Sequence, residues 1–130
     1  MQPAPVLPQA NRLTSGEAFR RTVRSGRRAG CRTLVCHWSP PQEPPRDPGA
    51  ADSVPCVKVG FVVSRAVGSA VTRTRVKRRL RHLVRERLGS LPPCGVLVVR
   101  ALPPAAGAPS AELRADLARC LDRLVERDAA

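Results

Sequence analysis

The chain has few of the residues that enzymes use for catalysis. Its 130 residues include two histidines and ten acidic residues against 23 lysines and arginines. Neither histidine stands at a metal-ligand spacing from a cysteine, and the acidic residues lie in loops or among arginines. We therefore expect no catalytic residue, no bound metal and no small-molecule substrate for the protein itself.

Long apolar runs and paired cysteines are also missing. No stretch approaches the roughly 18 apolar residues of a membrane span, and the opening MQPAPVLPQANRL lacks the basic and apolar parts of a signal peptide. The five cysteines form no CxxC pair and mostly stand in apolar runs, which is typical of reduced core thiols. These features predict a cytoplasmic protein with no membrane partner.

Aromatic residues are scarce, because the chain has two phenylalanines, one tryptophan and no tyrosine. Proteins that bind single-stranded nucleic acid usually stack the bases on aromatic rings over a cationic groove. Any base stacking by this chain is therefore expected to be weak. The length allows one domain with one modest hydrophobic core.

Positive charge is concentrated in two segments. The formal net charge is +13, and residues 12–32 hold seven arginines with one glutamate, while residues 58–87 hold ten basic residues with one glutamate. A solvated charged face would mix both signs along a helix. The segregation predicts a surface for a polyanion, and nucleic acid is the first candidate. A basic coat without a specific partner is the alternative.

The first half of the chain predicts one helix and two strands. Residues 1–10 are expected to be a disordered tail, and residues 11–128 a single domain. Thr14 and Glu17 have the spacing of a capping box, which predicts a helix from about 15 to 24. Alternation predicts strands over 31–38 and 55–64, separated by a solvated proline-rich loop at about 39–53.

The second half predicts two helices around one strand. After Gly68, residues 69–88 predict a long helix that buries a single stripe, formed by Val76, Leu80, Leu83 and Val84. A short strand at 95–100 and a helix at 110–127 follow. The order is α-β-β-α-β-α, an α/β (α+β) arrangement, with room for one more short strand in the proline-rich connection.

The central motif resembles a known family. The stretch KVGFVVSRAVGSAVTRTRVKRRLRHLV resembles the signature of the ribonuclease P protein family, in which a strand ending in serine leads through a glycine turn into a helix that begins Arg-Asn-Arg. The segment NRLTSGEAFRRTVRSGRR resembles the family's opening helix, so the likeness spans about residues 11–127. The resemblance implies a two-layer sandwich, like that of a ribosomal protein, with a left-handed βαβ crossover. Pattern alone would predict the usual right-handed connection.

The resemblance also implies a function in RNA processing. In this family the catalytic RNA subunit, with Mg²⁺, cuts the 5′ leader from precursor tRNA, and the protein subunit binds both RNAs without a cofactor of its own. The residues implied to bind the catalytic RNA are Arg65, Ser69, Arg73, Thr74, Arg75, Lys77, Arg78 and Arg81. Those implied to line the cleft for the leader are Phe19, Val23, Val35, His37, Lys58, Val62 and Ser64.

The chain departs from the family pattern at a few of these positions. Val23 and His37 stand where the family often has aromatic residues, and Thr74 and Ser69 replace asparagines. Threonine and serine have fewer donors than asparagine for a phosphate or a 2′-hydroxyl. Two alternatives are a DNA-binding or ribosome-associated basic module without a processing role, and a chain that is itself a nuclease. The first explains the charge but not the ordered motif, and the second lacks a catalytic cluster.

Overall fold

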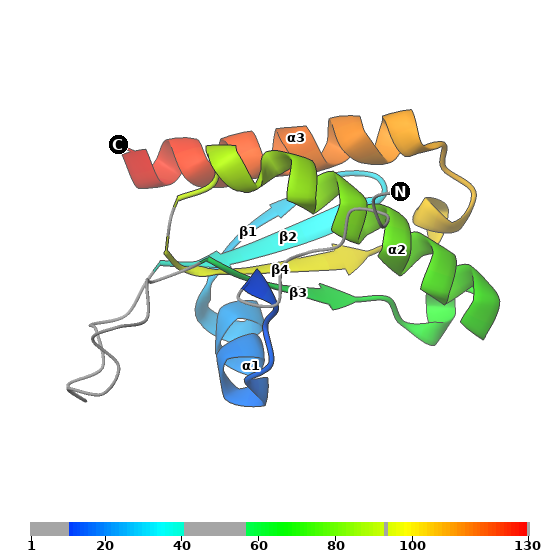
Figure 1. Cartoon of the computed structure of the whole chain (residues 1–130), viewed down its shortest axis with the longest axis horizontal. Helices are drawn as coiled ribbons and strands as arrows, with labels where there is room; N and C mark the ends of the chain where they lie inside the picture. Colours follow the sequence, from blue (N-terminus) through cyan, green and yellow to red (C-terminus); the bar gives the residue numbers. More distant parts are fainter. Residues whose placement is uncertain (1–10, 41–56, 93, 130) are drawn as a thin grey trace, which may run out of the picture.

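The computed structural model describes residues 11–40, 57–92 and 94–129, and Figure 1 shows their arrangement. The predicted tail, and the proline-rich loop from residue 41 onward, lie outside the described residues. In chain order the helices and strands are α1 (Gly16–Ser25), β1 (Arg27–Gly30), β2 (Leu34–Ser39), β3 (Lys58–Val62), α2 (Ala70–Arg87), β4 (Val96–Ala101) and α3 (Ser110–Ala129). Short 3-10 turns, η3 (Arg65–Val67), η4 (Leu88–Ser90) and η5 (Pro103–Ala106), join some of them. The α+β prediction is confirmed.

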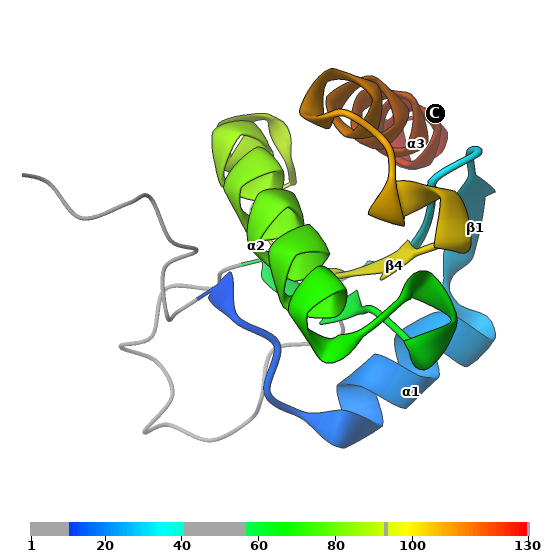
Figure 2. The same ribbon diagram turned by 90° about the vertical axis from the view of Figure 1, so that its right-hand side faces the viewer.

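The four strands form one sheet in the order β1-β2-β4-β3. The pairs β1–β2 and β2–β4 are antiparallel, and β3–β4 is parallel, so α2 is a crossover connection between adjacent parallel strands. In Figure 2, where β3 and β4 run toward the viewer, the chain rises from β3 into α2 and returns to β4 on the right of β3. This connection is left-handed, as the family resemblance implies and against the usual preference.

The main core lies between the sheet and the two long helices. Figure 1 shows α2 and α3 on one face of the sheet and α1 on the other. Leu34 and Leu97 from the strands, Leu80 from α2 and Leu113 from α3 are completely buried on the two-helix side. Alternate strand residues point to opposite faces, and α1 covers a second, smaller set that includes the fully buried Val98. The sheet and the two long helices thus form the expected two layers, and α1 packs on the opposite face of the sheet.

Strand β1 was not predicted from the sequence. The short strand that the sequence allowed in the proline-rich connection is a separate prediction, and from residue 41 onward that connection lies outside the described residues. The sequence Arg-Arg-Ala-Gly has no β-branched residue, and only Ala29 of this strand is buried. It becomes a strand because it pairs antiparallel with β2 at the edge of the sheet, where Arg28 lies opposite His37. Tertiary pairing here overrides a weak local preference.

The start of α1 also differs by one residue from the prediction. The N-cap is Ser15 and not Thr14, because the Ser15 hydroxyl oxygen accepts a hydrogen bond from the Ala18 backbone N–H at 3.2 Å. Both residues can cap a helix. Just before the cap, the Leu13 backbone N–H donates to the Val59 carbonyl of β3 at 2.9 Å.

Candidate nucleic-acid interface

Helix α2 buries one stripe and leaves basic residues on the rest of its surface. Val76, Leu80, Leu83 and Val84 are its buried residues, as predicted. Its single acidic residue, Glu86, lies in the last turn and is paired with His82 at 3.2 Å and with Arg114 of α3 at 3.4 Å. The turns before it carry no negative charge. We call the predicted set Arg73, Thr74, Arg75, Lys77, Arg78 and Arg81 the basic face of α2.

The turn before α2 is shaped by Gly68 and Ser69. Gly68 has φ of 155°, a region that glycine adopts without cost, and a Cβ there would meet Thr72 Cγ2 at 3.0 Å. Ser69 is the N-cap, and its Oγ accepts from the Thr72 backbone N–H at 3.3 Å. The hydroxyl predicted to contact RNA therefore already caps the helix. Arg65, in η3, is exposed beside this turn.

Two hollows follow the first turns of α2. One, of about 570 Å³, is lined by Ala70, Val71, Thr74, Arg75, Arg78 and Arg79, and the other, of about 200 Å³, by Val63, Ala70, Arg73, Thr74 and Lys77. Thr74 lies between them. In the first hollow Val71 is 77% exposed, so an apolar side chain stands among arginines at the tip of the helix. The positive end of the helix dipole adds to their charge.

A third hollow brings together residues from both predicted RNA surfaces. It has a volume of about 240 Å³ and lies at the β3 edge of the sheet, between α2 and the start of α1. Lys77 and Arg81 of α2 line it together with Arg12, Leu13 and Phe19, among others. Arg73, Lys77 and Arg81 recur every four residues, so they form one stripe along the helix. This stripe connects the basic face of α2 to the α1 side of the molecule.

On the α1 side, the sheet register aligns the predicted leader residues in rows. Val35, Arg100 and Val62 occupy one row across β2, β4 and β3, and His37, Val98 and Gly60 occupy the next. Gly60 lies directly under α1, because a Cβ there would approach Phe19 Cε2 to 2.7 Å and Leu13 Cδ2 to 2.8 Å. Figure 1 shows that the far ends of β3 and β4 extend beyond α1. In the first row Arg100 is exposed and Val62 half-buried, whereas Gly60 and Val98 of the second row are buried.

The structure differs from the prediction for two of the leader residues. Val35 and His37 were expected on an accessible strand face, but each is only 6% exposed. Burial, with smaller contributions from the nearby Arg100 and Arg28, lowers the pKa of His37. Its Nδ1 is buried without a hydrogen-bond partner. By contrast, Phe19, Val23, Lys58 and Val62 are half-buried and Ser64 is exposed.

Two cations near this face were missed from the sequence. Arg100 is exposed in β4 and lies in register with both Val35 and Val62. Arg28 is exposed in β1 and lies opposite His37. Alternation along β4 could have identified Arg100, because it shares a face with Val98. Arg28 could not be placed without strand β1.

Two other kinds of site were sought in residues 11–40, 57–92 and 94–129. No group of three or more His, Cys, Asp or Glu side chains in these segments is placed to hold a metal ion. None of the helices there is long and apolar enough to cross a membrane. The notable surface feature of this part of the chain is its positive charge.

Comparison with known proteins assigns the family. The sequence model of the family described as Ribonuclease P matches residues 7–125. The chain belongs to this family. It is 55% identical over 119 residues to a ribonuclease P protein component from Nocardioides, with 92% of this chain and 95% of the relative covered. It is 52% identical to the one from Streptomyces griseus, with 92% and 96% covered. The role of the ribonuclease P family is 5′ maturation of tRNA.

Solved structures support the fold independently. The ribonuclease P protein from Staphylococcus aureus matches with a TM-score of 0.69 at 21% identity, covering 88% of this chain and 94% of that one. The ribonuclease P protein from Thermotoga maritima also gives a TM-score of 0.69 at 21% identity, covering 86% and 96%. The ribonuclease P family fold therefore extends to relatives with low sequence identity.

Proposed function

We propose that this chain is the RNA-binding, non-catalytic subunit of ribonuclease P, and that the basic face of α2 binds the catalytic RNA. The observation that carries this is the row of cations on α2, uninterrupted by acidic side chains before Glu86 and placed around two surface hollows. Family membership supplies the partner class. Phosphate groups would neutralise these cations and release condensed counterions.

The charge at the start of α2 is unfavourable unless an anion is bound there. Arg73 and Arg75 lie in the first two turns, where the helix dipole is positive, and no acidic residue occupies the first turn. Backbone N–H groups and cations at a helix N-terminus together favour a phosphate. RNA docking would therefore relieve a repulsion that the free protein must tolerate.

We further propose that the 5′ leader of precursor tRNA binds on the α1 side of the sheet. Phe19, Val62 and Lys58 offer partly exposed surface there, and Arg100 adds a cation in the same row as Val62. The hollow lined by Phe19, Lys77 and Arg81 would connect this surface to the basic face of α2. Among the described residues this path offers few aromatic rings, Phe19 and the Phe61 that also lines the hollow, so leader binding should be mainly electrostatic.

The proposal assigns bond cleavage to the RNA subunit and its Mg²⁺. The described residues place no group of carboxylates or imidazoles to hold a metal, and His82 is paired with Glu86. The isolated protein should therefore leave precursor tRNA intact. Cleavage by the pure protein that disappears in His37→Gln or His82→Gln would contradict the non-catalytic role.

Reconstitution tests the proposal directly. The full chain is combined with a bacterial ribonuclease P RNA at low Mg²⁺, and cleavage of precursor tRNA is compared with the RNA alone. The protein should raise kcat/KM, and should do so more for a substrate with a leader of several nucleotides than for one with a single leader nucleotide. No gain with either substrate would refute the proposal and favour a basic module without a processing role.

The salt dependence of RNA binding tests the surface. Arg78→Ala removes a cation from the basic face of α2, and Arg119→Ala removes one from the mixed-charge surface of α3. Each phosphate contact contributes about 0.7 to 0.9 to the slope of log K against log salt. Arg78→Ala should reduce the slope for the catalytic RNA by about that amount, and Arg119→Ala should leave it unchanged. Equal slopes for both variants would mean that α2 is the wrong surface.

A further inference from the structure

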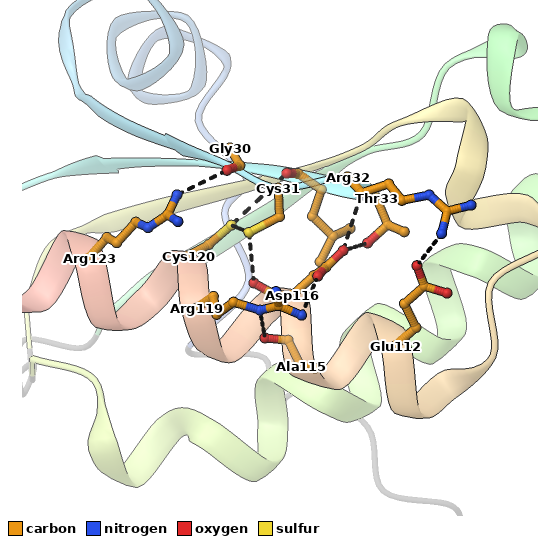
Figure 3. Close-up of polar contacts among 11 residues, drawn as sticks. Gly30, Cys31, Arg32, Thr33, Glu112, Ala115, Asp116, Arg119, Cys120 and Arg123 are labelled. Carbon is orange, nitrogen blue, oxygen red and sulfur yellow. Dashed lines mark hydrogen bonds and ion pairs between the residues drawn. The ribbon is translucent and has the colours of Figure 1, made fainter.

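Three cysteines from two distant segments of the sequence lie together where α3 packs against the sheet. Cys31 lies in the turn between β1 and β2, Cys36 lies in β2, and Cys120 lies in α3. The sulfur atoms of Cys31 and Cys120 are 3.4 Å apart, and Figure 3 shows them side by side. Cys36 and Cys120 are completely buried, whereas Cys31 is partly exposed. The RNA-binding surfaces described above use none of them.

The two backbones that carry Cys31 and Cys120 are fixed on both sides of the pair. Before Cys31, the Gly30 carbonyl accepts from Arg123 of α3 at 3.2 Å. After it, Thr33 donates its backbone N–H and its hydroxyl to Asp116 of α3 at 3.1 and 2.5 Å. These contacts are drawn in Figure 3. The sulfur atoms are thus held in contact, and a disulfide requires them to approach to about 2.05 Å.

We propose that Cys31 and Cys120 are an oxidisable dithiol that a peroxide converts into a disulfide, which fastens α3 to the β1–β2 turn. Cys31 is the sulfur that solvent reaches, and Cys120 is the resolving partner. Cys36 is buried in the middle of a strand, so a peroxide has no direct access to it. The proposal depends only on this cluster and holds whether or not the chain serves ribonuclease P.

The two thiols differ in how readily they ionise. Hydrogen bonding with Cys36 and, more weakly, with Cys31 lowers the pKa of Cys120 to about 7 against the opposing effect of burial. Burial, followed by the contact with Cys120, raises the pKa of Cys31 to about 11. Of these two thiols, Cys120 therefore ionises more readily. Cys31 reacts with peroxide through its small thiolate fraction, because it is the sulfur that solvent reaches, and Cys120 lies 3.4 Å away, where it can attack the oxidised sulfur.

The steps balance with peroxide as the oxidant. Cys31 Sγ attacks one peroxide oxygen, the O–O bond breaks, and Cys31 becomes a sulfenic acid while hydroxide leaves and takes a proton from solvent. The Cys120 thiol then attacks the Cys31 sulfur, so that the S–S bond forms, the S–O bond breaks and water leaves with the thiol proton. Two thiols lose two electrons and two protons, and one peroxide becomes two waters.

The test treats the reduced full chain with hydrogen peroxide, blocks the remaining thiols, and maps peptides by mass spectrometry. We expect a loss of two hydrogens and a peptide pair that joins Cys31 to Cys120. Cys31→Ser should abolish the link, whereas Cys94→Ser, which removes another partly exposed thiol, should retain it. A disulfide between other cysteines of the wild-type chain in place of Cys31–Cys120, or sulfinic acid at Cys31 without a disulfide, would overturn the proposal.

A second measurement tests whether the disulfide stabilises the attachment of α3 to the β1–β2 turn. The disulfide would close a long loop, since its partners are 89 residues apart, so the oxidised protein should melt at least roughly 5 °C higher than the reduced one. Dithiothreitol should reverse the shift, and Cys31→Ser should show none. An equal or lower Tm in the linked protein would refute the fastening role.

Discussion

Replacing Asp116 should reveal how α3 is held to the sheet. This residue is 3% exposed, and its Oδ2 accepts hydrogen bonds from both the backbone N–H and the hydroxyl of Thr33, which is completely buried. Its other oxygen, Oδ1, forms an ion pair with Arg119 at 3.1 Å. Asp116→Ala would leave two buried donors of Thr33 without acceptors.

The magnitude follows from the number of bonds lost. A hydrogen bond to a charged group contributes about 1.5 to 3 kcal/mol, and each buried donor left unsatisfied costs about 1 to 3 kcal/mol. Because the lost hydrogen bonds and the unsatisfied donors are partly the same contribution, Asp116→Ala should lower the free energy of unfolding by about 3 to 5 kcal/mol. Asp116→Asn keeps an acceptor for Thr33 and should cost about 1 kcal/mol. Arg119 is 62% exposed in its side chain, so Arg119→Ala should cost less than about 1 kcal/mol.

Urea unfolding followed by circular dichroism measures these differences as shifts in the midpoint at constant m-value. If Asp116→Ala does not fold, Thr33→Val provides the comparison, because it removes the hydroxyl and keeps the backbone N–H, with an expected loss of about 1 to 2 kcal/mol. Equal losses for the Asn and Ala variants, or a loss below about 1 kcal/mol for Asp116→Ala, would refute the reasoning.

Three further predictions concern the α1 side of the sheet. Gly60→Val should lower stability and leader affinity together, because its side chain would displace Phe19, which a Cβ would already approach to 2.7 Å; a melting curve equal to that of the wild type would contradict this. Stability should be complete above the unfolded histidine pKa of about 6.5 and should fall as the pH drops through it, because burial lowers the pKa of His37 in the folded state. His37→Gln should reduce the change in the urea unfolding midpoint between about pH 7.5 and 5. If the midpoint of this variant still falls with pH as in the wild type, His37 is not the cause. Arg100→Ala should weaken binding of a leader-containing precursor tRNA more than Arg119→Ala does, and equal affinities in a filter-binding assay would remove Arg100 from the leader surface.

Helix α2, its charged surface and the family could be predicted from the sequence because local patterns and composition determine them. The helical spacing of Val76, Leu80 and Leu83 predicted α2 and its buried stripe, because a long helix with one apolar side must pack that side against the core. The same pattern placed the cations on the remaining surface, and their segregation indicated nucleic acid. The motif of Gly68, Ser69 and the arginines after them indicated the family, which comparison then showed.

Other features needed the tertiary structure because they depend on contacts between distant segments. Strand β1 exists only through its pairing with β2. Burial of Val35 and His37 depends on where α1 crosses the sheet, which alternation along a strand cannot reveal. The hollow that joins Phe19 to Lys77 depends on the left-handed crossover, which places α2 beside the β3 edge.

The cysteines show the difference most clearly. From the sequence they are five thiols without a pairing motif, and their apolar surroundings predict core packing. Cys36 and Cys120 do lie in the core. Only the docking of α3 brings Cys120 within 3.4 Å of Cys31, 89 residues away, because Asp116 and Arg123 fix that helix against the β1–β2 turn. The apolar surroundings therefore indicated that Cys36 and Cys120 are buried, and the packing of distant elements decided which cysteines meet.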